Sequence, residues 1–93
     1  MLRTALAILG AAAIACGAVA QPVGVPVCDA LLVRLEACAV KLPEDLQGDL
    51  RVLNENMRQL LLDLGKRDAE TICRQNQDGY RRGRLHQEYG CRF

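Results

Sequence analysis

Four cysteines and one histidine are the residues of this chain that most readily suggest chemistry. Counted after the N-terminal region, they are Cys28, Cys38, Cys73, Cys91 and His86. Zinc sites usually take their ligands in pairs two to four residues apart, whereas nine residues separate the first two cysteines and seventeen separate the last two. The motifs of thioredoxin-like redox centres and c-type haem attachment, C-x-x-C and C-x-x-C-H, do not occur. We therefore predict no metal and no cofactor, and we assign the four cysteines to two disulfides.

The N-terminal residues predict export to a compartment in which disulfides form. A positively charged N-terminus precedes an apolar run over residues 5–14, and Ala18 and Ala20 are the small residues expected before a signal-peptidase cut. The run is shorter than the roughly 20 apolar residues needed to span a bilayer. We predict a signal peptide over residues 1–20, cleavage before Gln21, and a periplasmic or secreted product.

A second interpretation of this segment concerns a fifth cysteine, Cys16. The stretch Ala13-Ile14-Ala15-Cys16-Gly17 resembles a lipobox, in which the cysteine becomes the acylated first residue of a bacterial lipoprotein. Alanine stands where a lipobox usually has leucine, so we favour the cut before Gln21 and keep lipidation of Cys16 as the alternative. Only a lipid at Cys16 would place the protein on a membrane. Both interpretations leave the other four cysteines to pair.

The cysteines must be positioned by helices, because apolar residues recur at helical spacing and no strand pattern occurs. A first helix is predicted over about residues 28–41, ending before Pro43, and a second over about residues 44–64. A third begins near Asp68 and meets the turn signal Asp78-Gly79, beyond which we expect frayed helix or irregular chain. The apolar face of the first helix contains Cys28, Leu31, Leu32, Leu35, Cys38, Ala39 and Leu42. The second helix has an apolar face that we expect to be buried, formed by Leu46, Leu50, Leu53, Met57, Leu60, Leu61 and Leu64.

The domain organisation follows from these elements. Residues 21–27, which contain two prolines and a glycine, are predicted to form an extended tether. Residues 28–93 then form one all-α domain, a two- to three-helix hairpin or bundle stapled by two disulfides. A chain this short buries little apolar surface, and exported domains of its size often depend on disulfides.

The pairing of the cysteines is predicted from the rise of about 1.5 Å per residue along a helix. If the first helix runs upward from Cys28, Cys38 lies near its top, and the longer second helix returns below the level of Cys28. The third helix then climbs beside the first, so that Cys73 comes level with Cys28 and Cys91 arrives near Cys38. We predict Cys28–Cys73 and Cys38–Cys91, because bridged Cα atoms lie within about 7 Å. The nested pairing, Cys28–Cys91 with Cys38–Cys73, is the alternative if the chain folds back at Asp78-Gly79.

The order of these features resembles a known kind of protein. The features follow one another in this order: a signal peptide, a cysteine (Cys28), a short helix, a proline (Pro43), a long leucine-rich helix and a further cysteine (Cys73). This order is similar to that of small exported bacterial helical proteins of uncharacterised families. The resemblance implies an exported helical protein and no particular activity. The C-x9-C spacing also resembles half of a twin C-x9-C hairpin, but the second cysteine pair is spaced too widely for the other half.

Few other side chains suggest catalysis. The chain after residue 20 contains no serine and a single threonine, and carboxylate pairs such as Asp45/Asp49 fall on the polar side of a helix. His86 would need Cys73 or Cys91 as a nucleophilic partner. We therefore predict that the protein is not an enzyme.

The charges predict the kind of partner. Without the signal peptide the chain carries equal numbers of basic and acidic residues, and nucleic-acid binding relies on positive charge that neutralises phosphates. We therefore predict no nucleic-acid partner. The most concentrated charge is formed by Arg81, Arg82 and Arg84. These arginines are either solvated and acid-paired or a contact for an anionic partner or lipid headgroups.

A second apolar stripe lies on the first helix, opposite its main apolar face. It consists of Ala30, Val33, Ala37 and Val40. Because the disulfides hold the third helix on the cysteine side, we expect this stripe to face solvent, and we hypothesise that it contacts a protein partner or a second copy. We predict an exported binding or adaptor protein with an inhibitor, pilotin-like or chaperone-like role. The alternative is a lipoprotein with a structural or envelope role.

Overall fold

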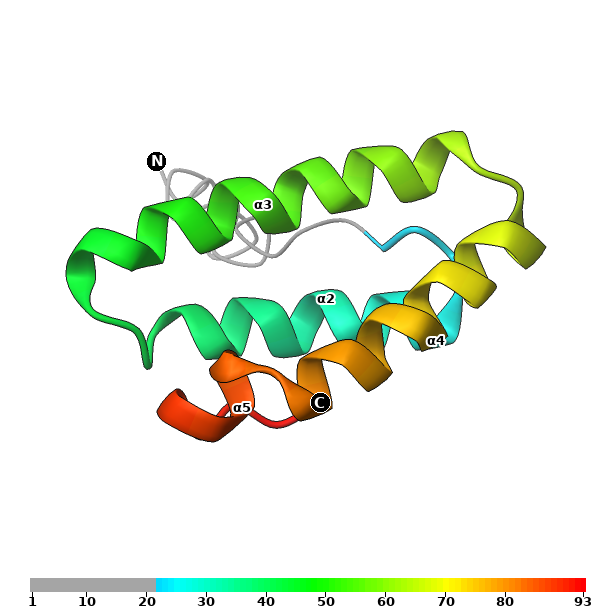
Figure 1. Cartoon of the computed structure of the whole chain (residues 1–93). Helices are drawn as coiled ribbons and strands as arrows, with labels where there is room; N and C mark the ends of the chain where they lie inside the picture. The colour runs from blue at the N-terminus through cyan, green and yellow to red at the C-terminus, as the bar shows by residue number, and fades with distance from the viewer. Residues whose placement is uncertain (1–21) are drawn as a thin grey trace, which may run out of the picture.

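Four α-helices make up the part of the chain that the structure describes, residues 22–93 (Figure 1). In this computed structural model they are α2 (Pro26–Ala39), α3 (Glu44–Asp63), α4 (Lys66–Arg82) and α5 (Arg84–Tyr89). The predicted all-α fold with two disulfides is confirmed. The predicted signal peptide, with Cys16 and the cut before Gln21, lies outside the described residues. Within residues 22–93, no helix combines the length and the apolar character needed to cross a membrane.

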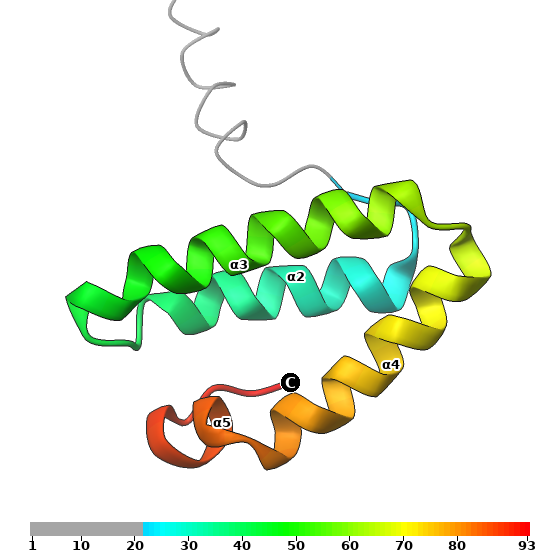
Figure 2. The same cartoon turned by 45° about the horizontal axis from the view of Figure 1, so that its top comes forward.

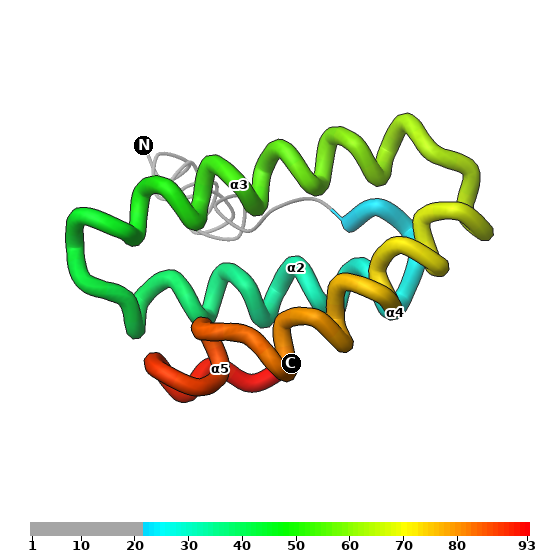
Figure 3. The backbone as a smooth tube through the Cα atoms, viewed as in Figure 1, coloured from blue at the N-terminus to red at the C-terminus, as the bar shows by residue number. Residues whose placement is uncertain are grey.

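The central helix is α2, which packs against both α3 and α4. Figure 1 shows α3 returning beside α2 in the opposite direction, and α4 turning back from the far end of α3. In Figure 2, α4 diverges from the α2–α3 pair and leads into α5. The tube in Figure 3 traces the short connections between these helices. α3 therefore rests mainly on α2, and α4 does not cover it.

The core is built on the apolar face predicted for the first helix, which α2 and the turn after it form. All seven residues of that face are buried, which confirms the prediction: Cys28, Leu31, Leu32, Leu35, Cys38, Ala39 and Leu42. The other segments contribute fewer buried apolar residues, among them Leu50 and Leu61 of α3, Ala69 and Cys73 of α4, and Cys91 and Phe93 of the C-terminus. α2 thus organises the fold.

Both disulfides join α2 to the C-terminal part of the chain. Cys28 is bonded to Cys73 with the Cα atoms 5.2 Å apart, and Cys38 is bonded to Cys91 with the Cα atoms 5.3 Å apart. The predicted pairing is confirmed, and the nested alternative does not occur. All four cysteines are buried, so both bonds lie inside the core.

The segment before α2 is packed on the core, which corrects the prediction of an extended tether over residues 21–27. The helix begins with proline at its first position, where proline fits well. The Asp29 carboxylate accepts hydrogen bonds from the backbone N–H groups of Val23 at 2.7 Å and Gly24 at 3.2 Å. Gly24 has a φ of +89°, a conformation that favours glycine. The resulting turn brings Val25 into the core.

α3 begins as predicted, with Pro43 at its N-cap and two acidic residues in its first turn. Its apolar face is only partly buried, which corrects the prediction that the whole face enters the core. Leu50 and Leu61 are buried. The exposed members of the face are Leu46, Leu53 and Leu60. They are exposed because α4 packs against α2, so that one edge of the α3 face has no helix packed over it.

A buried polar side chain lies in the α2–α3 interface. Asn54 is 4% exposed, and its Nδ2 group donates hydrogen bonds to the Leu32 carbonyl at 3.4 Å and to a Glu36 carboxylate oxygen at 3.2 Å. Its Oδ1 atom has no hydrogen-bond partner among the described residues. A buried acceptor without a partner costs about 1–3 kcal/mol. The Asn54 amide nitrogen is therefore bonded to α2, whereas its carbonyl oxygen has no partner in this interface.

α4 continues through Asp78-Gly79 to Arg82, which corrects the expectation of an interruption there. Contacts with the C-terminus support this part of the helix. The Phe93 ring stacks on the Tyr80 ring with centroids 5.1 Å apart. The Gln77 side-chain amide donates a hydrogen bond to the Phe93 carbonyl at 2.7 Å.

The C-terminal segment forms the short helix α5, after which the chain reverses its direction. After α5 the chain turns at Gly90, whose φ of +70° favours glycine. The Cys91 N–H then donates to the Leu85 carbonyl at 3.1 Å. His86 Nδ1 lies 2.8 Å from the Cys91 carbonyl oxygen. These contacts, together with the disulfide, position the last residues against α2.

Candidate functional site

An exposed line of leucines runs along α3. Leu46, Leu53 and Leu60 follow one another at intervals of seven residues, a spacing that keeps side chains in one row along a helix. They are 38%, 49% and 52% exposed. We call these three residues the leucine strip. An exposed apolar strip of this kind often marks an interaction site, so it is the first candidate binding surface.

One edge of the leucine strip is acidic. At 100° per residue, Asp45, Asp49 and Asp63 lie beside the strip on the side away from the core. All three are exposed, and within residues 22–93 none of them forms an ion pair. The surface therefore combines apolar side chains with negative charge that remains available to a partner.

The leucine strip leads into an apolar groove between α3 and α5. This groove has a volume of about 310 Å³. Its lining consists of Leu42, Leu46, Asp49, Leu50, Leu53, Arg84, Leu85 and Tyr89. Leu46 and Leu53 belong both to the strip and to the lining of the groove. The two features therefore form one continuous surface.

The predicted contact for an anionic partner, Arg81, Arg82 and Arg84, is divided by the structure. Arg84 forms an ion pair with Glu88, which lowers the pKa of the Glu88 carboxyl group below its usual value. It also lines the apolar groove. Arg81 and Arg82 are exposed in the last turn of α4, where positive charge offsets the helix dipole. Neither Arg81 nor Arg82 lines this groove together with Arg84.

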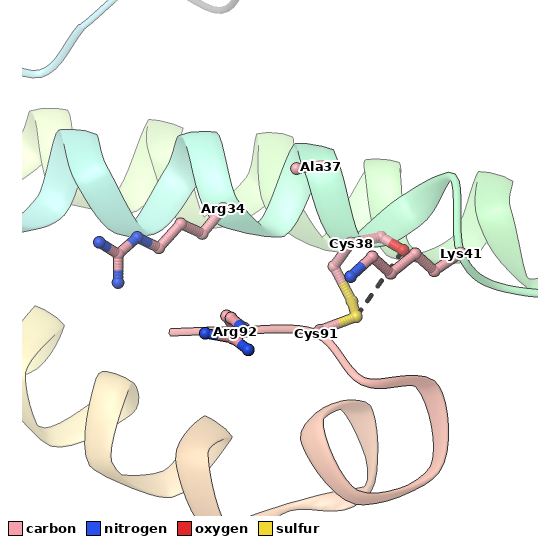
Figure 4. A pocket seen from close by; sticks show the side chains of 6 residues that line it. All are labelled: Arg34, Ala37, Cys38, Lys41, Cys91 and Arg92. Atoms are coloured by element: carbon pink, nitrogen blue, oxygen red, sulfur yellow. Dashed lines mark hydrogen bonds between the residues drawn. A yellow bond between two sulfur atoms is a disulfide. The ribbon is translucent and has the colours of Figure 1, made fainter.

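A basic hollow lies beside the Cys38–Cys91 disulfide (Figure 4). It has a volume of about 470 Å³. Its lining consists of Arg34, Ala37, Cys38, Lys41, Cys91 and Arg92. Figure 4 shows Arg34 extending from α2, Lys41 from the turn after α2, and Arg92 from the C-terminal segment. This site was not predicted from the sequence, although the predicted Cys38–Cys91 disulfide brings Arg92 to α2.

The small-residue stripe predicted on the first helix faces solvent as expected. Val33 and Val40 are 60% and 65% exposed, and Ala30 and Ala37 are exposed as well. Ala37 also lines the basic hollow. The hypothesis that this stripe contacts a partner stays a prediction.

Placing charge on this stripe is expected to leave the fold intact. Because both valines are largely exposed, the double variant Val33→Asp with Val40→Asp should change the free energy of unfolding by no more than about 1 kcal/mol. Denaturant unfolding followed by circular dichroism measures the change, with the buried substitution Leu31→Asp as the destabilised control. A loss above about 2 kcal/mol would show that the stripe belongs to the core. A folded double variant that loses a partner would support the stripe as a contact.

The residues that most readily suggest chemistry serve the fold. All four cysteines of the described residues are in disulfides, so Cys73 and Cys91 offer no free thiol to His86. His86 contacts a backbone carbonyl and lines neither the groove nor the basic hollow. In the described part of the chain, no three His, Cys, Asp or Glu side chains gather as metal ligands would.

Function must therefore be inferred from the leucine strip with its groove, the basic hollow and the small-residue stripe. The chain matches no family model, no curated protein and no solved structure with which it was compared.

Proposed function

We propose that this protein is an exported helical adaptor that binds an amphipathic helix of a partner protein. The observation that carries the proposal is the leucine strip, which stays exposed along about 21 Å of α3 and continues into the apolar groove. A partner helix laid along the strip would place its own apolar side chains in the groove. This is the helix-in-groove mode of recognition, in which residues at i, i+3, i+4 and i+7 act as anchors.

The acidic edge of the strip selects the kind of helix. Asp45, Asp49 and Asp63 would attract a partner helix that carries lysine or arginine beside its leucines, and they would repel an acidic one. A second copy that docked its α3 antiparallel onto this α3 would bring the two acidic edges together. Charge complementarity therefore favours a different, basic partner over an antiparallel dimer formed through α3.

Export is the second part of the proposal. It rests on the signal-peptide pattern of residues 1–20, and the two disulfides support it because such bonds persist mainly in oxidising compartments. Mass spectrometry of the mature protein tests where the signal peptide is cleaved. A chain that begins at Gln21 is expected, whereas a chain that begins at an acylated Cys16 would replace this proposal with an anchored lipoprotein. The identity of the partner decides between an inhibitor, a pilotin-like factor and a chaperone.

Binding of a synthetic helix tests the proposed surface. A peptide of about 20 residues, with leucine at heptad spacing and lysine beside it, is expected to bind the disulfide-bonded protein. A matched peptide with glutamate in place of lysine should bind at least about tenfold more weakly. Leu53→Glu removes a leucine contact of about 1.5–3 kcal/mol, so it should weaken binding of the lysine peptide by at least about tenfold. Isothermal titration calorimetry measures these affinities.

The control for this experiment is Leu62→Glu, which makes the same substitution on another exposed leucine of α3. Leu62 is 46% exposed and lies on the side of α3 opposite the leucine strip and its acidic edge, so this variant should bind the lysine peptide within about threefold of the unmodified protein. Equal loss of binding in the two variants would contradict the proposed surface. Concentration-dependent dimerisation that Leu53→Glu abolishes would instead assign the strip to a second copy.

A further inference from the structure

We infer that the basic hollow binds a phosphate group between Arg34 of α2, Lys41 of the turn after α2 and Arg92 of the C-terminal segment. The ligand is either free phosphate or the phosphate of a lipid headgroup, which share this chemistry. The inference is independent of the proposed helix-binding surface, because that surface lies on α3 and α5 and shares no residue with the basic hollow.

The charges around the basic hollow are of one sign. Its lining contains three cationic side chains and no acidic one. Across residues 22–93, none of Arg34, Lys41 and Arg92 forms an ion pair. The Lys41 ammonium donates one hydrogen bond to the Gly90 carbonyl at 3.1 Å, which positions it, and it carries two further donors. An anion in the hollow would supply the missing counter-charge.

The fold fixes the three cations relative to one another. Arg34 lies in α2, and Lys41 lies in the turn that follows it, where the Lys41 N–H donates a hydrogen bond to the Cys38 carbonyl at 2.9 Å. Arg92 follows Cys91 directly, and the disulfide to Cys38 holds this segment against α2. In Figure 4, Lys41 lies beside this disulfide, Arg92 follows Cys91, and Arg34 lies farther along α2. The site is therefore assembled from both ends of the described chain by a covalent bond.

The magnitudes of the charges favour a phosphate. The C-terminal end of α2, which carries about half a negative charge, lies at the basic hollow. The three positive charges of the lining outweigh this half negative charge. Their sum matches the double negative charge of phosphate better than the single charge of a carboxylate. A guanidinium group also binds phosphate through two parallel N–H donors. The volume of about 470 Å³ accommodates a phosphate together with waters, each of which occupies about 30 Å³.

Titration of the full disulfide-bonded protein with inorganic phosphate, followed by NMR, tests this site. Saturable shifts are expected at the signals of the three cationic residues. The double variant Arg34→Gln with Arg92→Gln should weaken phosphate binding by at least about tenfold. The matched double variant Arg81→Gln with Arg82→Gln removes the same net charge outside the hollow and should bind within about twofold. All four arginines are exposed, so both variants should fold, which circular dichroism verifies.

Phosphatidylcholine vesicles with and without phosphatidic acid distinguish the two sources of phosphate. Binding to the phosphatidic acid vesicles alone would assign the basic hollow to a lipid headgroup, and binding to inorganic phosphate would assign it to the free ion. Either result supports the site if Arg34→Gln with Arg92→Gln loses the binding and Arg81→Gln with Arg82→Gln retains it. Equal weakening in the two variants, or no saturable binding of either probe, would overturn the inference.

Discussion

Replacing Cys28 and Cys73 together by alanine is expected to lower the free energy of unfolding by about 4 kcal/mol. The bond joins residues 45 positions apart, and in the chain-entropy model a loop of this length constrains the unfolded chain by about that amount. The total stability of a small domain is only about 5–15 kcal/mol, so one bond makes up a large share of it. Equilibrium unfolding in guanidinium chloride measures the change.

The matched variant replaces Cys38 and Cys91 by alanine. Its bond joins residues 53 positions apart, so the expected loss is again about 4 kcal/mol. Removal of both bonds should abolish the cooperative transition, because the apolar core of so short a chain is small. A loss below about 1 kcal/mol for either pair would show that packing alone holds the helices.

Leu35→Ala is expected to cost about 3 kcal/mol, whereas Leu53→Ala should cost less than about 1 kcal/mol. Leu35 is fully buried on the central helix, and truncation of a buried leucine usually costs about 2–5 kcal/mol. Leu53 is 49% exposed and lies in the leucine strip, so its truncation leaves little cavity. The same unfolding experiment compares the two variants. Equal losses would show that Leu53 is a core residue and would remove the strip as a free surface.

The central part of this fold can be predicted from the sequence. Helical periodicity decides which residues share a face, and for α2 all seven residues of the predicted face are buried. The rise per residue determines how far along the helix axis each cysteine lies. It therefore predicts the two cysteine pairs that the structure shows. Both arguments succeed because they depend on the geometry of single helices and on short connections.

The surface of α3 could not be predicted in the same way. Periodicity identifies the apolar side of a helix, but it does not say how many neighbouring elements cover that side. Leu46, Leu53 and Leu60 share a face with buried leucines and stay exposed, because α4 packs against α2. Asn54 interrupts the same face and is buried, since its amide reaches the Leu32 carbonyl and Glu36.

The C-terminal part depends on contacts between residues far apart in the sequence. Asp78-Gly79 is a turn signal by local preference, yet α4 continues through it, and Phe93 packs on Tyr80, the residue directly after Gly79. The basic hollow likewise requires the Cys38–Cys91 bond, which brings Arg92 to α2. Once that pairing is predicted, the neighbouring Arg92 is the signal that could have pointed to this site.

Methyl NMR of the disulfide-bonded protein during titration with the lysine-bearing peptide tests most directly whether the leucine strip binds a helix. We predict that the methyl signals of Leu46, Leu53 and Leu60 shift together and saturate, while those of Val33 and Val40 on the far side of α2 stay in place. Shifts at the two valines with the three leucine signals unchanged would contradict the proposed surface.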